Sequence, residues 1–450
     1  MRIGWIGLFL LFIGNLGGSL MPVEAAENAS DSIEFQPPLV VDQGWSYSHS
    51  NRALVDFVFI VENPNQNIAL ERNLYQATAY SENGTELGRC SGCIAVLFPG
   101  ERLGVGAVVR VPETEEIAKF EAVITAEKAI YTELIENPLK PGEAAYIPYQ
   151  SAPMVTGIIE NSMGRSVSNV MVTAVAYDDD GNIIGGGATS SSTFVPAMDR
   201  TGVTVWISSR GVPAKVELYP SFYQHSVFLD PSGWLKVVNL ENLEEACSVV
   251  EPVKEALSIE AVGFVQQATG TVYYAFVADN PSEVHSLYSA NYRAVAYDRE
   301  ERVLGTGSGI IGLVFAGERM GVTGNLQIPR GMKVDRVEID IDSFSAKPVE
   351  MPIRNPLTAE RVAYLSDQFL PRVTGVIKNS LDRDVQWVSL SVITYDESGK
   401  IMGVGSGSVN FVPAGGQAAA DVFVYDTGKP ARTELYPKVS NPMDLGFEDS

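Results

Sequence analysis

The stretch VMVTAVAYDDDGN, residues 170–182, decides the fold expected of this chain. Its first eight residues, Val170 to Tyr177, place β-branched and apolar side chains in near alternation, which is typical of a strand rather than a helix. Asp, Gly and Asn follow, and a tight turn between antiparallel strands favours these residue types. The related stretch VSLSVITYDESGK, residues 388–400, repeats this arrangement. Such strand-and-turn units recur at roughly ten-residue intervals, which predicts immunoglobulin-like antiparallel β-sandwiches.

The chain contains a tandem duplication at an offset of 217 or 218 residues. Its clearest pairs are Asn63-Pro64 with Asn280-Pro281, Phe98-Pro-Gly-Glu-Arg102 with Phe315-Ala-Gly-Glu-Arg319, and Glu217-Leu-Tyr-Pro220 with Glu434-Leu-Tyr-Pro437. Each half also repeats weakly within itself, because Asn63 and Asn161 occupy corresponding positions 98 residues apart. Fixed spacing of this kind is the signature of repeated structural units.

The predicted fold class is therefore all-β, with four sandwiches in an A-B-A′-B′ order. The expected boundaries are a signal peptide at 1–25, A at 34–133, B at 134–221, an acidic connector at 222–255, A′ at 256–351, B′ at 352–438 and a tail at 439–450. The connector has no counterpart within either half and is interpreted as a spacer that allows the halves to move relative to each other.

Composition excludes several classes of function. The chain has 450 residues, with 32 Lys and Arg against 55 Asp and Glu, and a net charge of −23. Such a surface repels phosphate backbones and anionic lipids, which argues against nucleic-acid partners and peripheral membrane docking. Three histidines and three cysteines leave little material for metal or nucleophile chemistry.

The first residues have the features of an export signal. Arg2 precedes an apolar run from Ile3 to Leu20, and Val23-Glu24-Ala25 supplies the small residues of a cleavage site, which predicts a secretory signal peptide. The expected location is secreted, extracellular or on the cell surface. No other stretch has the length of apolar sequence needed for a membrane span.

The B units resemble the FxLYD type of small β-sandwich domain found in exported bacterial proteins. The matching features are Gly157…Asn161 and Gly375…Asn379, the Tyr177-Asp178 and Tyr395-Asp396 hairpins, the Phe-Val-Pro corners and the closing Glu-Leu-Tyr-Pro strands. The A units are similar to the water-stress/late-embryogenesis type of sandwich, in which Asn-Pro follows the first strand. Neither resemblance implies a known active site.

Cys90 and Cys93 form a Cys-x-x-Cys pair in a Gly-rich strand. A local disulfide is the favoured interpretation in an exported protein, while a reduced, metal-bound or redox-active pair is the alternative. A zinc site requires about four ligands, and no second Cys/His pair is present. Cys247 is then a single thiol or forms an intermolecular bridge, in preference to pairing with Cys90 or Cys93.

Asp178, Asp179 and Asp180 are a weak candidate for a Ca²⁺ site, because the ion prefers clustered carboxylate oxygens. An EF-hand needs Glu at its twelfth position, which here is Thr189. The strand turn explains the same residues and is the favoured interpretation. A Ca²⁺-stabilised structural array remains an alternative function.

Four aromatic residues are candidates for binding carbohydrate: Trp45, Tyr47, Tyr273 and Tyr274. Packing in the core or between domains is favoured for them, and Trp206 and Trp387 are expected in the core because they lie within strands.

No recognisable nucleophile, base or phosphate-binding motif occurs, so no enzyme activity or cofactor is expected. The sequence predicts an exported module for binding, adhesion or spacing whose partner is a protein or an envelope polysaccharide, with a carbohydrate-binding accessory protein as the alternative.

Overall fold

The computed structural model describes residues 34–49, 51–132, 136–148, 153–189, 193–222, 227–229, 235–237, 257–342, 347–349, 354–366, 370–439 and 445. Within these ranges the regular secondary structure consists of β-strands, without an α-helix, which confirms the predicted all-β class. No helix among these residues therefore has the length and apolar character to cross a membrane. The predicted signal peptide and Cys247 lie outside the described residues.

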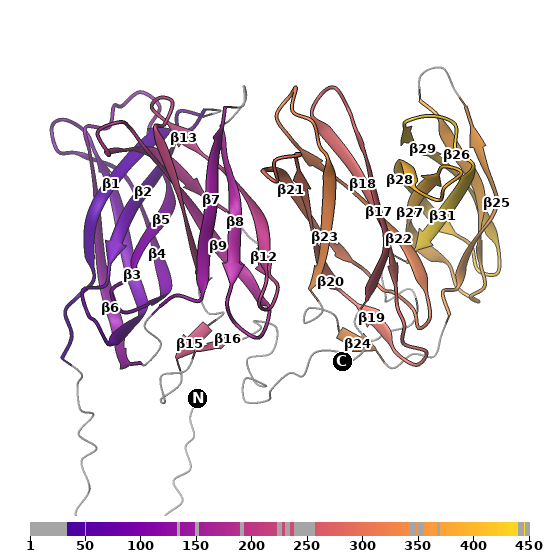
Figure 1. Ribbon diagram of the computed structural model, residues 1–450, viewed down its shortest axis with the longest axis horizontal. Helices are drawn as coiled ribbons and strands as arrows, with labels where there is room; N and C mark the ends of the chain where they lie inside the picture. Colours follow the sequence, from indigo (N-terminus) through magenta and orange to yellow (C-terminus); the bar gives the residue numbers. More distant parts are fainter. Residues whose placement is uncertain are drawn as a thin grey trace, which may run out of the picture. The chain divides into compact units, whose positions relative to one another are not determined.

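Sandwich A consists of two three-stranded antiparallel sheets (Figure 1). One sheet has the order β1-β2-β5, with β1 Leu39–Tyr47, β2 Leu54–Glu62 and β5 Arg102–Arg110. The other has the order β4-β3-β6, with β3 Ile68–Tyr80, β4 Glu86–Leu97 and β6 Lys119–Tyr131. Their inner faces enclose aromatic residues, among which Phe57 and Phe120 stack at a centroid distance of 4.4 Å.

Sandwich B places a three-stranded sheet against a five-stranded one. The first has the order β12-β8-β7, with β7 Leu139–Ile147, β8 Met154–Asn161 and β12 Arg200–Trp206. In the second, β9 (Val167–Tyr177) pairs with β10 (Ile183–Ala188), β11 (Thr193–Val195) and β14 (Lys215–Phe222), and β10 also pairs with β13 (Ser208–Ser209). Val155, Val172 and Val203 are among the buried residues of its core.

The second half repeats both sandwiches. A′ contains β17 Ser258–Gln266, β18 Thr271–Asp279, β19 Ser286–Tyr288, β20 Ala290–Tyr297, β21 Val303–Ile311, β22 Arg319–Gln327, β23 Arg336–Asp342 and β24 Lys347–Val349. B′ contains β25 Leu357–Leu365, β26 Arg372–Asn379, β27 Val385–Tyr395, β28 Ile401–Val412, β29 Gln417–Phe423, β30 Tyr425–Asp426 and β31 Arg432–Lys438. In the predicted connector, β15 (Val227–Leu229) pairs with β16 (Leu235–Val237).

A buried asparagine closes the same corner in every sandwich. In A, the Nδ2 of Asn63 donates to the carbonyls of Ile68, Leu97 and Phe98 at 2.9–3.1 Å, and its Oδ1 accepts the N–H of Asn65. The equivalent residues Asn161, Asn280 and Asn379 make the same pattern of bonds. Because buried backbone carbonyls need donors, this explains why Asn ends or directly follows the second strand of each sandwich.

A residue with left-handed backbone interrupts the following strand in each sandwich: Arg72, Asn169, Ser289 and Trp387, with φ between 51° and 64°. In β27 the kink shifts the alternation, so that Val385 and Val388 are both buried while Trp387 between them is 63% exposed. The prediction that Trp387 lies in the core is therefore wrong, because the kink turns its side chain out. Trp206 ends β12 and is 48% exposed, so its predicted burial is also wrong.

The sandwiches of one half pack sheet against sheet. Val58 and Ile60 of A cluster with Val175 and Ile183 of B. The A′–B′ junction has a matching cluster that includes Ala275 and Ile401. Central strands such as β2 are therefore buried on both faces, which is why they read as continuous apolar runs rather than as alternating ones.

Candidate functional site

A cavity of about 490 Å³ lies where sandwich A meets sandwich B. Its walls come from three segments: the β4–β5 corner at Phe98–Leu103, the entry to β7 between Glu136 and Ala144, and residues Val216–Pro220 of β14. The lining includes five charged side chains from these segments together with Tyr219, so the cavity is polar as well as apolar: Glu101, Arg102, Glu136, Lys140 and Glu217. Such concave sites with a few convergent polar groups are typical of ligand binding.

Glu101 is the partly buried acid of this cavity. Its Oε2 accepts the N–H of Phe98 at 2.7 Å, and its Oε1 accepts the side-chain amide of Asn137 at 2.8 Å. Burial raises the pKa of Glu101 to about 7, although both hydrogen bonds and Lys140 oppose the shift. Desolvation disfavours the charged form of a carboxyl group, so this side chain changes protonation near neutral pH.

Asn137 connects Glu101 to sandwich B. The Nδ2 of Asn137 also donates to the carbonyl of Pro220 at 3.2 Å, and its Oδ1 accepts the N–H of Leu139 at 2.9 Å. In the second half, Asn355 makes the same three contacts, including a 2.6 Å bond to Glu318. Glu318 accepts the N–H of Phe315 at 2.8 Å, and burial raises its pKa as well. The arrangement therefore holds the two sandwiches of each half together.

A tyrosine–glutamate cluster forms the β14 wall of the cavity. Tyr219 donates from its hydroxyl to Glu217 at 2.5 Å, and the hydroxyls of Tyr219 and Tyr177 lie 3.2 Å apart. Partial burial opposes ionisation of Glu217, but hydrogen bonds from Lys215 and the tyrosines hold its pKa below the usual range. Burial raises the pKa of Tyr177 to about 12. At neutral pH the cluster thus presents one carboxylate beside neutral hydroxyls.

The repeated motifs contained a signal for these residues. Phe-x-Gly-Glu-Arg and Glu-Leu-Tyr-Pro recur in both halves, and their Glu and Tyr residues form the cavity walls. Sequence reasoning used the motifs as evidence of duplication and missed them as a site. Glu101 and Asn137 are 36 residues apart in the sequence, so no local sequence pattern indicates their contact.

Cys90 and Cys93 lie in β4, paired in regular register with Ala77 and Leu74 of β3. Residues three apart in a regular strand point to opposite faces, so their sulfur atoms cannot meet, and the structure contains no disulfide between them. The structure therefore does not show the predicted local disulfide. Burial raises the pKa of the Cys90 thiol, which does not favour an activated thiolate.

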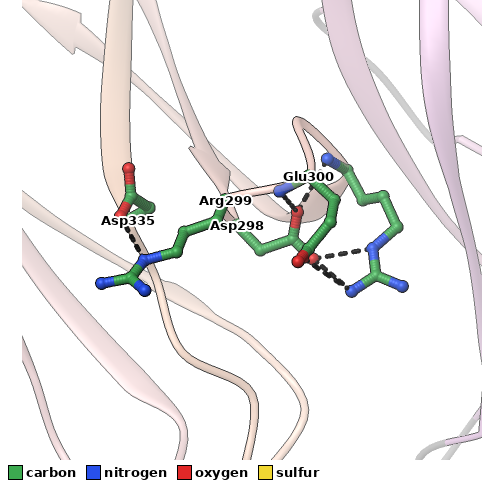
Figure 2. Close-up of polar contacts among 5 residues, drawn as sticks. Asp298, Arg299, Glu300 and Asp335 are labelled. Atoms are coloured by element: carbon green, nitrogen blue, oxygen red, sulfur yellow. Dashed lines mark hydrogen bonds and ion pairs between the residues drawn. The ribbon is translucent and has the colours of Figure 1, made fainter.

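The Asp178 carboxylate belongs to the hairpin turn. Its Oδ1 accepts the N–H groups of Asp180 and Asn182 at 3.0 and 2.8 Å, while Asp179 and Asp180 are exposed. Asp298 makes the same turn in A′, where it accepts the N–H of Glu300 at 3.0 Å (Figure 2). Among the described residues, no group of three or more His, Cys, Asp or Glu side chains is arranged to hold a metal ion.

Figure 2 also shows that the residues around the Asp298 turn form ion pairs. The Nε of Arg299 lies 3.4 Å from Asp335, and Nη2 of Arg302 lies 2.6 Å from Asp298. The carboxylates of this hairpin are thus neutralised by arginines of the same unit.

The aromatic candidates are used in internal packing. Trp45 is half-buried against Phe120 at 5.4 Å, with Arg210 over its other side at 5.0 Å. The hydroxyl of Tyr47 accepts the N–H of Ile117 at 3.2 Å. Tyr274 is buried in the A′ core, and Tyr273 stacks on Tyr425 at 3.8 Å. The structure does not bring the four together on one exposed face.

Comparisons with known proteins indicate only distant likeness. No protein-family model and no curated protein matches the chain. Among solved structures, a Salmonella α-2-macroglobulin is 11% identical over 90% of this chain and 38% of its own, with a TM-score of 0.13. An exo-chitosanase of Amycolatopsis orientalis is 8% identical over 85% of this chain and 92% of its own, with a TM-score of 0.14. The chain thus spans well under half the length of that macroglobulin.

Proposed function

We propose that the protein is an exported, non-enzymatic tandem β-sandwich module that binds a partner at the cell surface or outside the cell, with the A–B cavity as its ligand site. The observation that supports this proposal is the cavity of about 490 Å³, with convergent charged side chains on rigid strands and corners. Sites on such elements are held more precisely than sites on free loops.

The environment of Glu101 supports a binding role over a catalytic one. A buried carboxyl group with a raised pKa is a feature of many active sites. Here both oxygens are engaged by Phe98 and Asn137, and Glu318 repeats these bonds in the second half. A carboxyl group that makes the same hydrogen bonds in both halves serves to hold the two sandwiches together. The other residues of the cavity lining then remain available to bind a ligand.

Retention of the mature protein, beginning at Ala26, on envelope and secreted fractions of its source tests this proposal. We expect the wild-type protein to be retained and Arg102→Trp to be lost from the bound fraction, because an indole at this exposed position in the cavity lining is expected to cover the opening. The matched control is Arg383→Trp, which alters an exposed arginine of B′ whose carboxylate neighbour lies 3.7 Å away.

The possible results separate the alternatives. Equal retention of both variants would place the binding surface elsewhere, and absence of retention for every form would indicate a passive spacer. Repeating the retention experiment for each protein with Ca²⁺ and with a chelator tests the Ca²⁺-stabilised array. If Ca²⁺ stabilises the array, retention should be lost when the chelator removes the ion.

A further inference from the structure

The two halves of the chain differ at one arginine beside the tyrosine–glutamate cluster. In the second half, Nη1 of Arg319 lies 2.7 Å from the hydroxyl of Tyr436 and 3.2 Å from Oε2 of Glu434. The equivalent arginine of the first half, Arg102, has its Nε 3.8 Å from Glu62 on the neighbouring strand. The same motif therefore holds a guanidinium group on its acidic cluster in one copy and directs it elsewhere in the other.

One substitution between the copies removes the carboxylate that anchors the arginine in the second half. Glu260 lies at the irregular position of β17 and accepts a hydrogen bond from Nε of Arg319. The corresponding position in β1 is Val41, skipped in the register between Val40 and Asp42 just as Glu260 is skipped between Ile259 and Ala261. Valine cannot accept a hydrogen bond, so Arg102 lacks the anchor that holds Arg319 over its cluster.

The glutamate of the cluster, its cation and its tyrosine on the same strand are alike in the two halves. Glu217 and Glu434 each pair through Oε1 with a cation on their own strand, Lys215 and Arg432, and through Oε2 with a tyrosine hydroxyl. A Cβ placed at Gly104 would meet the ring of Tyr219 at 2.5 Å, and one at Gly321 would meet Tyr436 at 2.4 Å. The two tyrosines are thus held in the same place.

We infer that the A–B cavity binds the guanidinium group of a ligand, on Glu217 and Tyr219, in the position that Arg319 occupies within the second half. The inference rests on the proposed binding function and assigns the chemical class of the ligand. Guanidinium groups pair with carboxylates through directional hydrogen bonds, and the net charge of −23 favours cationic partners. The group comes either from an arginine side chain of a protein or from a small guanidinium compound.

Calorimetric titration of the full mature chain tests this. The probe is N-acetyl-L-arginine methylamide, with free L-arginine as the second probe and the uncharged isostere N-acetyl-L-citrulline methylamide as control. We expect one saturable site for the arginine amide and none for the citrulline amide. Stronger binding of the capped amide than of free arginine indicates a peptide source, and the reverse order indicates a small molecule.

Three variants assign the site. Glu217→Gln removes the charge and is expected to weaken binding about tenfold or more, as for loss of a hydrogen bond to a charged group. Val41→Glu supplies the missing anchor and is expected to abolish binding, because Arg102 then covers the cluster. Arg319→Ala exposes the equivalent cluster and is expected to raise the stoichiometry from one site to two.

Thermal unfolding with ethylguanidinium provides a second readout. This cation is expected to raise the midpoint of Arg319→Ala more than that of the wild-type protein, by occupying the place of the deleted side chain. Absence of a saturable site in the wild-type chain, or equal binding of the citrulline amide, would overturn the inference. If either result accompanied retention that depends on the cavity, the ligand class would be wrong while the binding function would stand.

Discussion

The side-chain amide of Asn137 donates to the carboxyl group of Glu101 across 2.8 Å, joining the segment that precedes β7 of sandwich B to a corner of sandwich A. The same amide holds the carbonyl of Pro220 on β14. One residue thus links the corner of A, the entry to B and the last strand of B. Its counterpart Asn355 does the same in the second half.

Replacement of Asn137 by Ala should destabilise the A–B junction. The carboxyl group of Glu101 and the carbonyl of Pro220 lose their donor, and an unsatisfied buried acceptor costs about 1–3 kcal/mol. Hydrogen–deuterium exchange is expected to show faster exchange at β7 and at the Phe98–Arg102 corner. Asn355→Ala is the matched control, with faster exchange in the A′–B′ half alone. Unchanged exchange in the first half would contradict the linking role.

The stability of the first half should depend on the protonation of Glu101. The folded-state pKa of Glu101, about 7, lies above the ordinary glutamic acid pKa of 4.5. The folded form therefore binds more protons between these values, and stability falls as pH rises through that interval. Other buried acids titrate too, since burial raises the pKa of Asp340 to about 6, so the measured quantity is the difference between wild type and Glu101→Gln.

We expect the midpoint of thermal unfolding of the wild-type protein to fall more than that of Glu101→Gln between pH 4.5 and pH 7. The difference should stay constant at higher pH. Parallel pH profiles for the two proteins would show that Glu101 titrates normally in the folded state.

Val58 and Gly186 form a size-matched pair across the A–B junction. A Cβ at Gly186 would lie 2.3 Å from the carbonyl oxygen of Ala174 and 2.7 Å from Cγ1 of Val58, so Gly186→Val should destabilise the junction by about 1–3 kcal/mol through overpacking, and only the part due to Val58 is relieved by shortening that side chain. The second half reverses the sizes, because Ala275 and Val404 occupy the equivalent positions in its cluster. The double variant Val58→Ala/Gly186→Val copies that arrangement.

Chemical denaturation of the four proteins of this cycle measures the coupling. We expect the double variant to be more stable than the sum of the two single changes predicts, as for residues in direct contact. Additive effects would mean that the two side chains do not share one space.

Trp387 occupies a left-handed backbone conformation with φ 51°, where B has Asn169 with φ 56°. Asn tolerates this region, whereas a bulky side chain is an outlier there, and strain of this kind costs about 1–3 kcal/mol. Trp387→Asn should therefore stabilise B′, and the reciprocal Asn169→Trp should destabilise B. Urea unfolding followed by circular dichroism checks both. Destabilisation by Trp387→Asn would show that contacts of the indole outweigh the backbone strain.

Cys90 and Cys93 should remain unlinked to each other after purification under air. Their positions on opposite faces of β4 prevent a bond without disruption of the β3–β4 pairing. Peptide mapping with alkylation before reduction is expected to yield no peptide with an internal 90–93 bridge. Recovery of that bridge from folded protein would require an irregular β4.

Local residue patterns predicted the strands, the hairpins and the duplication. Each pattern encodes a structural preference that depends only on a few residues next to it in the sequence. Alternation in Val170–Tyr177 and Gly at tight turns each have a consequence that is independent of distant segments. The fold class and the repeat order follow from them. The Asp178 turn belongs to the same group, since its carboxylate bonds only within the hairpin.

Long-range packing decided the features that the sequence left open. Glu101 meets Asn137, Arg319 reaches Tyr436, and Trp387 turns outward only because distant strands and a backbone kink place them so. The two halves share the acidic cluster in sequence, yet the position of its arginine depends on Val41 or Glu260 in another strand. Strand formation is a local preference, whereas a cavity and its charges depend on which surfaces the folded chain brings together.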